Sequence, residues 1–307
     1  MATRFEIVLH GENEIAMRAA AEEAFQEIES IEAQLSLFRP TSEVSHLNTR
    51  AAHEPVRVTP PLFSLLKQAR DLSEKTNGAF DITVAPLVRC WGFLERAGRI
   101  PTPEEIAQAR ALVGWKNISL DETNFTVRFL REGVMLDFGA IGKGYAIERA
   151  ANLLREAGMT SGILHGGTST IYASGKPVDA ETWKIGIEKP PEKNSPQVRA
   201  RNESPQLLTT ISLCDEALSV SAISGKTFDA DGKTFGHVID PRTGQPVSET
   251  LLAAVALPSA TETDALSTAL LTLGASGTEL LAELFPHARS FLFSKSSVEK
   301  NFETSSL

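Results

Sequence analysis

The sequence predicts an α+β fold in one compact unit, with room for two lobes. The chain has 307 residues, enough to bury a large core, and its apolar and charged fractions of 42% and 22% are those of ordinary globular proteins. Strand-like and helix-like segments are mixed along it, without an internal repeat or a low-complexity segment. A membrane-spanning, fibrous or disordered class is therefore not indicated.

The first third of the chain contains one strand and three helices. Residues 3–9 are expected to form a strand and 13–36 a long helix, because apolar residues recur there at helical spacing. A second helix is expected over 60–76, opened by two prolines and closed by Asn77-Gly78. Residues 79–100 look irregular and aromatic, and a third helix begins at Thr102.

The rest of the chain is richer in strands. Strands are expected at 116–120, 125–130, 133–137, 161–165, 169–174, 183–188, 207–213, 217–221 and 288–294, with a hairpin around Asp231-Gly232. Helices are expected from the glycine-rich turn after residue 138 to about 157, and over 260–273 and 276–285. The polar stretch 190–205 is expected to be a surface loop. This pattern predicts one domain over 1–294 and a polar C-terminal tail over 295–307.

Charge and cysteine content exclude some function classes. A formal net charge of -9 argues against nucleic acid as a partner. Cys90 and Cys214 have no metal-ligand spacing, and two buried thiols are the simplest interpretation. No apolar run approaches the ~20 residues of a membrane span. The segment 1–10 carries Glu6 and is unlike a signal peptide, so a cytoplasmic location is expected as written, or a periplasmic or membrane-anchored one if a leader has been removed.

The segment Asp137-Phe-Gly-Ala-Ile-Gly-Lys-Gly144 is the first candidate site. A glycine-rich turn before a helix lets backbone amides approach an anion, and Lys143 can add a full charge for a phosphate. The pattern is neither a Walker A motif nor a dinucleotide fingerprint. Alone, it is more simply interpreted as a tight turn with an exposed lysine.

A second candidate is the pair Asp264 and Thr268, which share one face of a predicted helix. A carboxylate and a hydroxyl can bind a hard cation such as Mg²⁺. The alternative is a helix cap in Thr261-x-x-Asp264 with an ordinary threonine.

Two further segments are candidates. His237 precedes the turn Asp240–Gly244 and could act as a base facing a cleft, or be a structural histidine. Asn77-Gly-Ala-Phe-Asp81 could stack on a ring and bind it by hydrogen bonds, although a core phenylalanine with a turn aspartate is the simpler reading.

Taken together and in this order, these segments resemble the ApbE family, the FAD:protein FMN transferases. Five motifs carry the resemblance: Leu35–Glu43, Gly78–Asp81 with Trp91–Phe93, Leu136–Gly144, His237–Gly244 and Asp264–Leu270. Three positions depart from the family pattern. Phe38 stands where Tyr is usual, Gly142 stands where Ala is usual, and Gly166-Gly-Thr168 replaces Gly-Gly-Asp.

The resemblance implies a T-fold-related single domain of mixed sheets and packed helices, and a role for each matching residue. The metal, Mg²⁺, would be held by the Ala140 carbonyl, Asp264 and Thr268. Lys143 and His237 would be catalytic, with His237 as the base to test. Contacts with FAD would fall on Met1, Phe38, Ala79, Phe80, Asp81, Asp137, Lys143 and Val238.

The activity that the resemblance implies is Mg²⁺-dependent transfer of FMN from FAD to a Thr or Ser hydroxyl of an acceptor flavoprotein, with release of AMP. The acceptor would carry a motif of the form Asp-x-x-Ser/Thr-Gly-Ala-Ser/Thr. Two alternatives stay open. The same site could hydrolyse FAD to FMN and AMP, or the protein could bind FAD without turnover.

Overall fold

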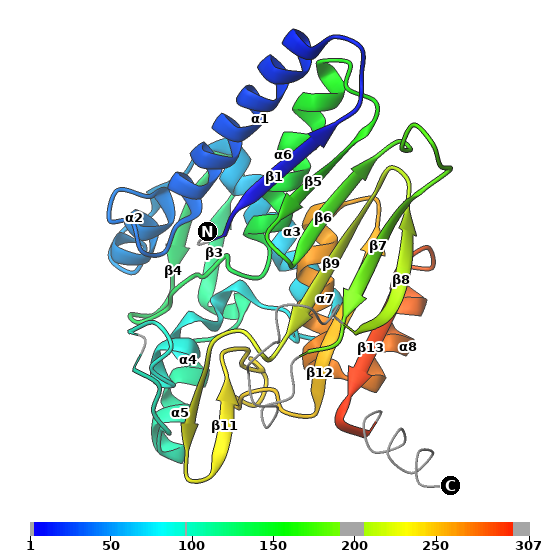
Figure 1. Ribbon diagram of the computed structural model, residues 1–307. Helices are drawn as coiled ribbons and strands as arrows, with labels where there is room; N and C mark the ends of the chain where they lie inside the picture. Colours follow the sequence, from blue (N-terminus) through cyan, green and yellow to red (C-terminus); the bar gives the residue numbers. More distant parts are fainter. Residues whose placement is uncertain (1–2, 96, 191–205, 297–307) are drawn as a thin grey trace, which may run out of the picture.

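The fold is built on a six-stranded antiparallel sheet with strand order β1-β5-β6-β9-β12-β13. The computed structural model describes residues 3–95, 97–190 and 206–296. The strands are β1 (Phe5–Leu9), β5 (Gly162–Gly166), β6 (Thr170–Ser174), β9 (Glu216–Ala222), β12 (Thr250–Leu257) and β13 (Arg289–Ser294). Strands from both ends of the chain thus form the two edges of one sheet (Figure 1).

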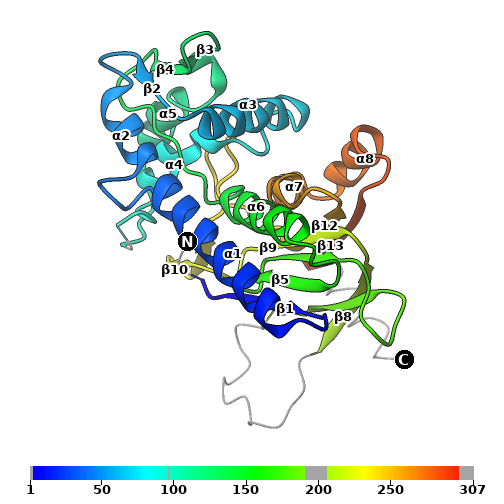
Figure 2. The ribbon, with the colours of Figure 1, turned by 90° about the horizontal axis from the view of Figure 1, so that it is seen from above.

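A row of helices covers one face of this sheet, as Figure 2 shows. They are α1 (Glu14–Leu35), α6 (Gly142–Glu156), α7 (Ala260–Leu273) and α8 (Ala275–Leu284). Helix α1 is capped by the Asn13 side chain, which accepts from the Ala16 amide at 3.1 Å. Its buried residues recur every three or four positions, which confirms the expected amphipathic stripe.

The other face of the sheet is covered by the paired strands β7 (Trp183–Glu188) and β8 (Leu207–Leu213). Successive residues of β12 therefore pack into different cores. Ala253 and Val255 face the helices, whereas Leu252 and Ala254 face β7 and β8. Since both faces are buried, β12 is apolar from Leu251 onwards and lacks the alternation of a half-exposed strand.

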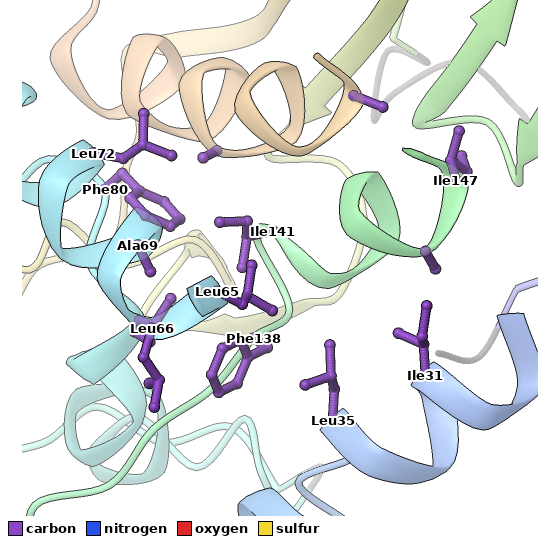
Figure 3. Close-up of a cluster of buried hydrophobic side chains, with 14 of the residues drawn as sticks. Ile31, Leu35, Leu65, Leu66, Ala69, Leu72, Phe80, Phe138, Ile141 and Ile147 are labelled. Atoms are coloured by element: carbon purple, nitrogen blue, oxygen red, sulfur yellow. The ribbon is translucent and has the colours of Figure 1, made fainter. Parts of the chain in front are cut away.

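The remaining elements lie on the far side of the helical row. They are α2 (Glu43–Arg50), β2 (Val56–Arg57), α3 (Pro60–Lys75), α4 (Ala85–Cys90), α5 (Pro103–Ala111), β3 (Ile118–Asp121) and β4 (Thr126–Phe129), with 3₁₀ turns η1 (Ile82–Val84) and η2 (Trp115–Asn117). The hairpin β10 (Thr227–Ala230) and β11 (Lys233–Gly236) lies beside α4 and α5 (Figure 1). Figure 3 shows how α3 joins the helical row, with Leu65 and Leu66 turned towards Phe138 and Ile141.

The structure confirms the α+β class and most of the expected elements, and it corrects five points. Residues 133–137 are not a strand, and 85–90 form helix α4 within the stretch expected to be irregular. Helix α2 and strand β12 were not predicted. Cys90 is buried as expected, but Cys214 is exposed because it lies in the tight turn between β8 and β9.

Two expectations fall largely outside the described residues. They are the surface loop over 190–205 and the polar tail over 295–307. Within the described ranges, none of the helices combines the length and the apolar character needed to cross a bilayer.

Candidate active site at the start of helix α6

Asp137 begins the glycine-rich turn and is fixed by backbone hydrogen bonds. Its amide donates to the Ile82 carbonyl at 2.7 Å, and its carboxylate accepts from the Gly139 amide at 2.8 Å. The preceding residue, Leu136, is hydrogen-bonded to a side chain and not to a neighbouring strand. The Asn48 amide group accepts from the Leu136 N–H at 2.8 Å and donates to the Leu136 carbonyl at 2.9 Å. This clamp explains why 133–137 has no strand partner.

Gly144 and Lys143 join the first turn of α6 to Asp264 on α7. The Gly144 amide donates to Asp264 Oδ2 at 2.9 Å, and Lys143 Nζ lies 3.7 Å from Asp264 Oδ1. A Cβ atom at Gly144 would lie only 2.1 Å from the Ala260 carbonyl oxygen. Glycine is thus required at this position for the two helices to come close enough for the amide–carboxylate bond.

Hydroxyl groups lie around Asp264, a residue that is only 3% exposed. Thr170 Oγ1 on β6 donates to Asp264 Oδ1 over 3.4 Å. One turn along α7, Thr268 Oγ1 donates to the Asp264 carbonyl at 3.3 Å and lies 3.2 Å from Ser221 Oγ of β9. The sheet and two helices therefore contribute to one oxygen-rich cluster.

His237 lies after β11 and is held by the backbone of Lys226. The His237 amide donates to the Lys226 carbonyl at 3.0 Å, and His237 Nδ1 lies 3.2 Å from the same oxygen. Because a carbonyl only accepts, Nδ1 must carry a proton, and Nε2 of the neutral ring is then an acceptor. The ring edge is packed closely, since a Cβ at Gly225 would lie 2.9 Å from His237 Cε1.

The charges of these groups act on one another. Burial raises the pKa of Asp137 above its ordinary value, and the Gly139 hydrogen bond and the cations Lys226 and Lys143 partly oppose that rise. Burial lowers the pKa of His237, and the same two lysines lower it further, although its bond to the Lys226 carbonyl opposes the shift. Asp137, Lys143, Lys226 and His237 therefore share one electrostatic environment.

Asp81 adjoins this cluster, because the next residue, Ile82, accepts the Asp137 amide bond. The Asp81 carboxylate accepts from the Thr83 amide at 2.8 Å, from the Thr83 hydroxyl at 2.7 Å and from the Ser73 hydroxyl at 3.1 Å. Burial raises the pKa of Asp81, and these bonds oppose the rise. The carboxylate caps the turn η1, which is the structural role considered for it from the sequence.

The other candidate flavin contacts lie in different surroundings. Phe80 is 1% exposed in the core, so its side chain cannot stack on a ligand in this conformation, and Ala79 is equally buried. Val238 is partly buried beside His237. Phe38 is 68% exposed just after α1 and is available for stacking. Met1 lies outside the described residues.

The turn that follows His237 is a structural one. Arg242 donates to Asp240 from Nε and Nη2 at 2.9 and 2.8 Å. The Trp91 indole N–H donates to the Gly244 carbonyl at 2.9 Å. These bonds fix the turn after His237 and join it to the end of α4.

The donor set around Asp264 suits a hard cation. The buried Asp264 carboxylate and the Thr268 hydroxyl are oxygen ligands of the kind that Mg²⁺ prefers, and the Ala140 carbonyl belongs to the turn that leads into α6. Over the described ranges no three His, Cys, Asp or Glu residues form a cluster. With a single carboxylate, the site leaves coordination positions for water and for a ligand's own oxygens.

Sequence reasoning missed Lys226, Thr170 and Ser221. Lys226 lies in the turn before β10 and belongs to no motif. It contacts His237 only because the β10–β11 hairpin brings the two residues together. Thr170 and Ser221 reach Asp264 and Thr268 because β6 and β9 are adjacent strands under α7. No local sequence signal marks these three residues.

Comparisons with known proteins agree with the fold. The model of the ApbE family matches residues 1–291, and the chain belongs to that family. The FAD:protein FMN transferase of Haemophilus influenzae is 31% identical over 269 residues, which cover 84% of this chain and 75% of the relative. The FAD:protein FMN transferase of Vibrio cholerae is 31% identical over 250 residues, covering 80% and 71%.

Solved structures give the same result. The ApbE protein of Thermotoga maritima superposes with a TM-score of 0.84 at 28% identity, covering 96% of this chain and 92% of its own. The flavin transferase ApbE of Vibrio cholerae gives a TM-score of 0.80 at 27% identity, covering 96% and 91%.

Proposed function

We propose that this protein is a Mg²⁺-dependent FAD:protein FMN transferase, which moves FMN from FAD to a Thr or Ser hydroxyl of an acceptor flavoprotein and releases AMP. One observation carries the proposal: the buried Asp264 carboxylate is joined to the first turn of α6 by the Gly144 amide and Lys143. A helix start, a lysine and a hard-cation donor set at one point suit a pyrophosphate. The names of the curated relatives support the same activity.

Three residues would hold the metal: Asp264, Thr268 and Ala140 through its carbonyl. When bound, Mg²⁺ would supply positive charge to the pyrophosphate oxygens of FAD. Lys143 is proposed to bind phosphate oxygens beside it. The remaining FAD contacts are proposed at Met1, Phe38, Ala79, Phe80, Asp81, Asp137 and Val238; for Phe80 and Ala79, whose side chains are buried, the contact would be through the backbone.

His237 is proposed as the general base. The acceptor hydroxyl oxygen forms a bond to the FMN phosphorus, and the bond from that phosphorus to the bridging oxygen breaks, so that its electron pair leaves with AMP. The hydroxyl proton passes to His237 Nε2, the ring nitrogen that the bond at Nδ1 leaves as an acceptor. Asp137 and Lys143 would fix FAD on either side of this reaction.

The test combines the protein, FAD, Mg²⁺ and acceptor domains with an Asp-x-x-Ser/Thr-Gly-Ala-Ser/Thr motif. Covalent flavin is detected by its fluorescence on the denatured acceptor, and AMP is measured in parallel. We expect one AMP per flavin attached, and at least a ~100-fold loss of rate in Asp264→Asn, since removing a preorganised charge costs on that order. Glu283→Gln, which alters an exposed carboxylate on α8, is the control.

Two outcomes would contradict the proposal. If AMP and free FMN appeared at the same rate with and without acceptors, the protein would be an FAD pyrophosphatase. Tight FAD binding without any AMP release in Mg²⁺ would indicate a flavin-binding protein.

A further inference from the structure

We propose that Lys226 is a second phosphate-binding cation of this site, which binds the pyrophosphate of FAD together with Lys143. The inference rests on FAD being the substrate, as proposed above. It assigns a role to a residue outside the motifs that carry the family resemblance, in the turn between β9 and β10.

The backbone of Lys226 is fixed relative to the candidate base. Its carbonyl accepts from both the His237 amide at 3.0 Å and His237 Nδ1 at 3.2 Å. The preceding Gly225 lies so close to the imidazole that a Cβ would come within 2.9 Å of Cε1. The backbone of Lys226 is therefore fixed beside the His237 ring, and its side chain is exposed.

The charge of Lys226 acts on two groups of the site, Asp137 and His237. It favours the charged form of the Asp137 carboxylate and disfavours the charged form of the His237 ring, and Lys143 acts on the same two groups in the same sense. Lys143 belongs to α6 and Lys226 to the β9–β10 turn, so two cations from different elements converge on Asp137 and His237.

The two lysines differ in how their charges are compensated. Lys143 Nζ is 3.7 Å from Asp264 Oδ1 and 3.2 Å from the Gly139 carbonyl, so part of its charge is already neutralised. Within the residues that the structure describes, no carboxylate pairs with Lys226. Its charge is available to a ligand, and a dinucleotide pyrophosphate brings about two negative charges to the site.

This role gives Lys226 a specific signature in ligand binding. A cation that contacts the pyrophosphate raises affinity for FAD and ADP but not for riboflavin, which has no phosphate. A residue that only supports the fold around His237 would affect all three ligands alike. Because the contact is between charges, FAD affinity should also fall as salt concentration rises.

The experiment measures the affinities of the full chain for FAD, ADP and riboflavin in the presence of Mg²⁺. The variants are Lys226→Met and Lys226→Arg. The control is Lys233→Met, in the adjoining β10–β11 hairpin. Lys226→Met is expected to weaken FAD and ADP binding at least ~10-fold, the value of a charged hydrogen bond. Riboflavin affinity should be unchanged, the salt dependence of FAD binding should be shallower, and Lys226→Arg should recover most of the loss. Lys233→Met should match the original chain.

Unchanged FAD affinity and salt dependence in Lys226→Met would overturn the inference, as would an equal loss for riboflavin. These binding results are separate from the transferase proposal. If the unaltered protein bound FAD with the expected Lys226 dependence but transferred no FMN, the proposed function would fail and the assignment of Lys226 would stand.

Discussion

At the scale of single residues, one hydrogen bond decides what His237 can do. The Lys226 carbonyl near Nδ1 fixes the tautomer, and burial with two nearby lysines keeps the ring neutral. A neutral ring with Nε2 unprotonated is the form that a general base requires. The hydrogen bond and the depressed pKa therefore favour the same chemical state.

The pH dependence of activity follows from this state. Because the pKa of His237 is below its ordinary value of 6.5, the base stays competent at slightly acidic pH. The acid limb of kcat/KM for FMN transfer is expected below pH 6.5, and His237→Asn should lose that limb and about 100-fold or more in rate. A pH–rate profile of both proteins checks this, and an acid limb that persists unchanged in His237→Asn would rule out His237 as the base.

Stability gives a second readout that needs no turnover. The pKa of His237 is lower in the folded chain than its ordinary value of 6.5 in the unfolded chain. Between these two pKa values the unfolded chain binds a proton at His237 and the folded chain does not. The free energy of unfolding therefore falls as pH falls through this range. This contribution is fully present above pH 6.5. Urea unfolding from pH 7.5 to 5 should show a shallower decline in His237→Asn than in the original chain. His53→Asn, which alters an exposed histidine after α2, should leave the slope unchanged.

Sequence reasoning reached those site residues that have a local pattern. Asp264 and Thr268 could be placed on one helical face from their spacing, and Lys143 at a helix start from the glycines around it. Lys226 and Thr170 could not be found, because their neighbours are separated by 11 and 94 positions in the chain. Residues that reach a site only through the arrangement of strands and turns have no local sequence pattern that would reveal them.

At the scale of elements, the contact between α6 and α7 controls the geometry of the candidate metal site. Gly144→Ala would put a Cβ 2.1 Å from the Ala260 carbonyl oxygen, and backbone cannot yield as a flexible side chain can. The helices must then separate, which is expected to destabilise the fold by about 1–3 kcal/mol and to weaken the amide bond to Asp264. Chemical unfolding measures the first effect, and Mg²⁺ dependence of transfer measures the second.

Gly142→Ala is the matched control on the same helix. A Cβ there would meet Leu35 and Phe138 at 3.6 and 3.7 Å, ordinary contact distances. Its stability is expected to stay within a few tenths of a kcal/mol or to rise slightly, since alanine favours helix more than glycine. Equal losses in the two variants would show that crowding at α7 is not the cause.

The prediction of elements failed in two situations. One is a strand that is buried on both faces, and the other is an extended segment that is not paired with a strand. Strand β12 is buried on both faces, so no alternation marks it. Residues 133–137 look like a strand, yet Leu136 bonds to the Asn48 side chain and Asp137 to the Ile82 carbonyl. The helices α1 and α7 were predicted within two residues because the helical spacing of their residues is a local pattern.

At the scale of the whole molecule, the candidate site draws on parts that are far apart in sequence. Asp137 is bonded to the η1 turn, Asp264 belongs to the helical row, and His237 follows the β10–β11 hairpin. A ligand held by all three would tie these parts together and stabilise the entire fold.

Thermal unfolding tests this coupling. FAD with Mg²⁺ at about 100 times its Kd is expected to stabilise the protein by about 2.7 kcal/mol, which corresponds to a rise in Tm of about 5 °C. Chelation by EDTA should remove much of the shift, and Asp264→Asn should make the remaining shift insensitive to Mg²⁺. A full shift in the presence of EDTA would contradict a metal-bridged pyrophosphate.

The Asn48 clamp on Leu136 bears on the order in which the chain folds. It joins residues 88 positions apart, and closing so long a loop costs conformational entropy before any contact compensates for it. The helices on either side can form from local contacts, whereas the orientation of Asp137 must wait for α2 to arrive. We therefore expect the turn of the candidate site to become ordered late in folding, after the helices beside it have formed.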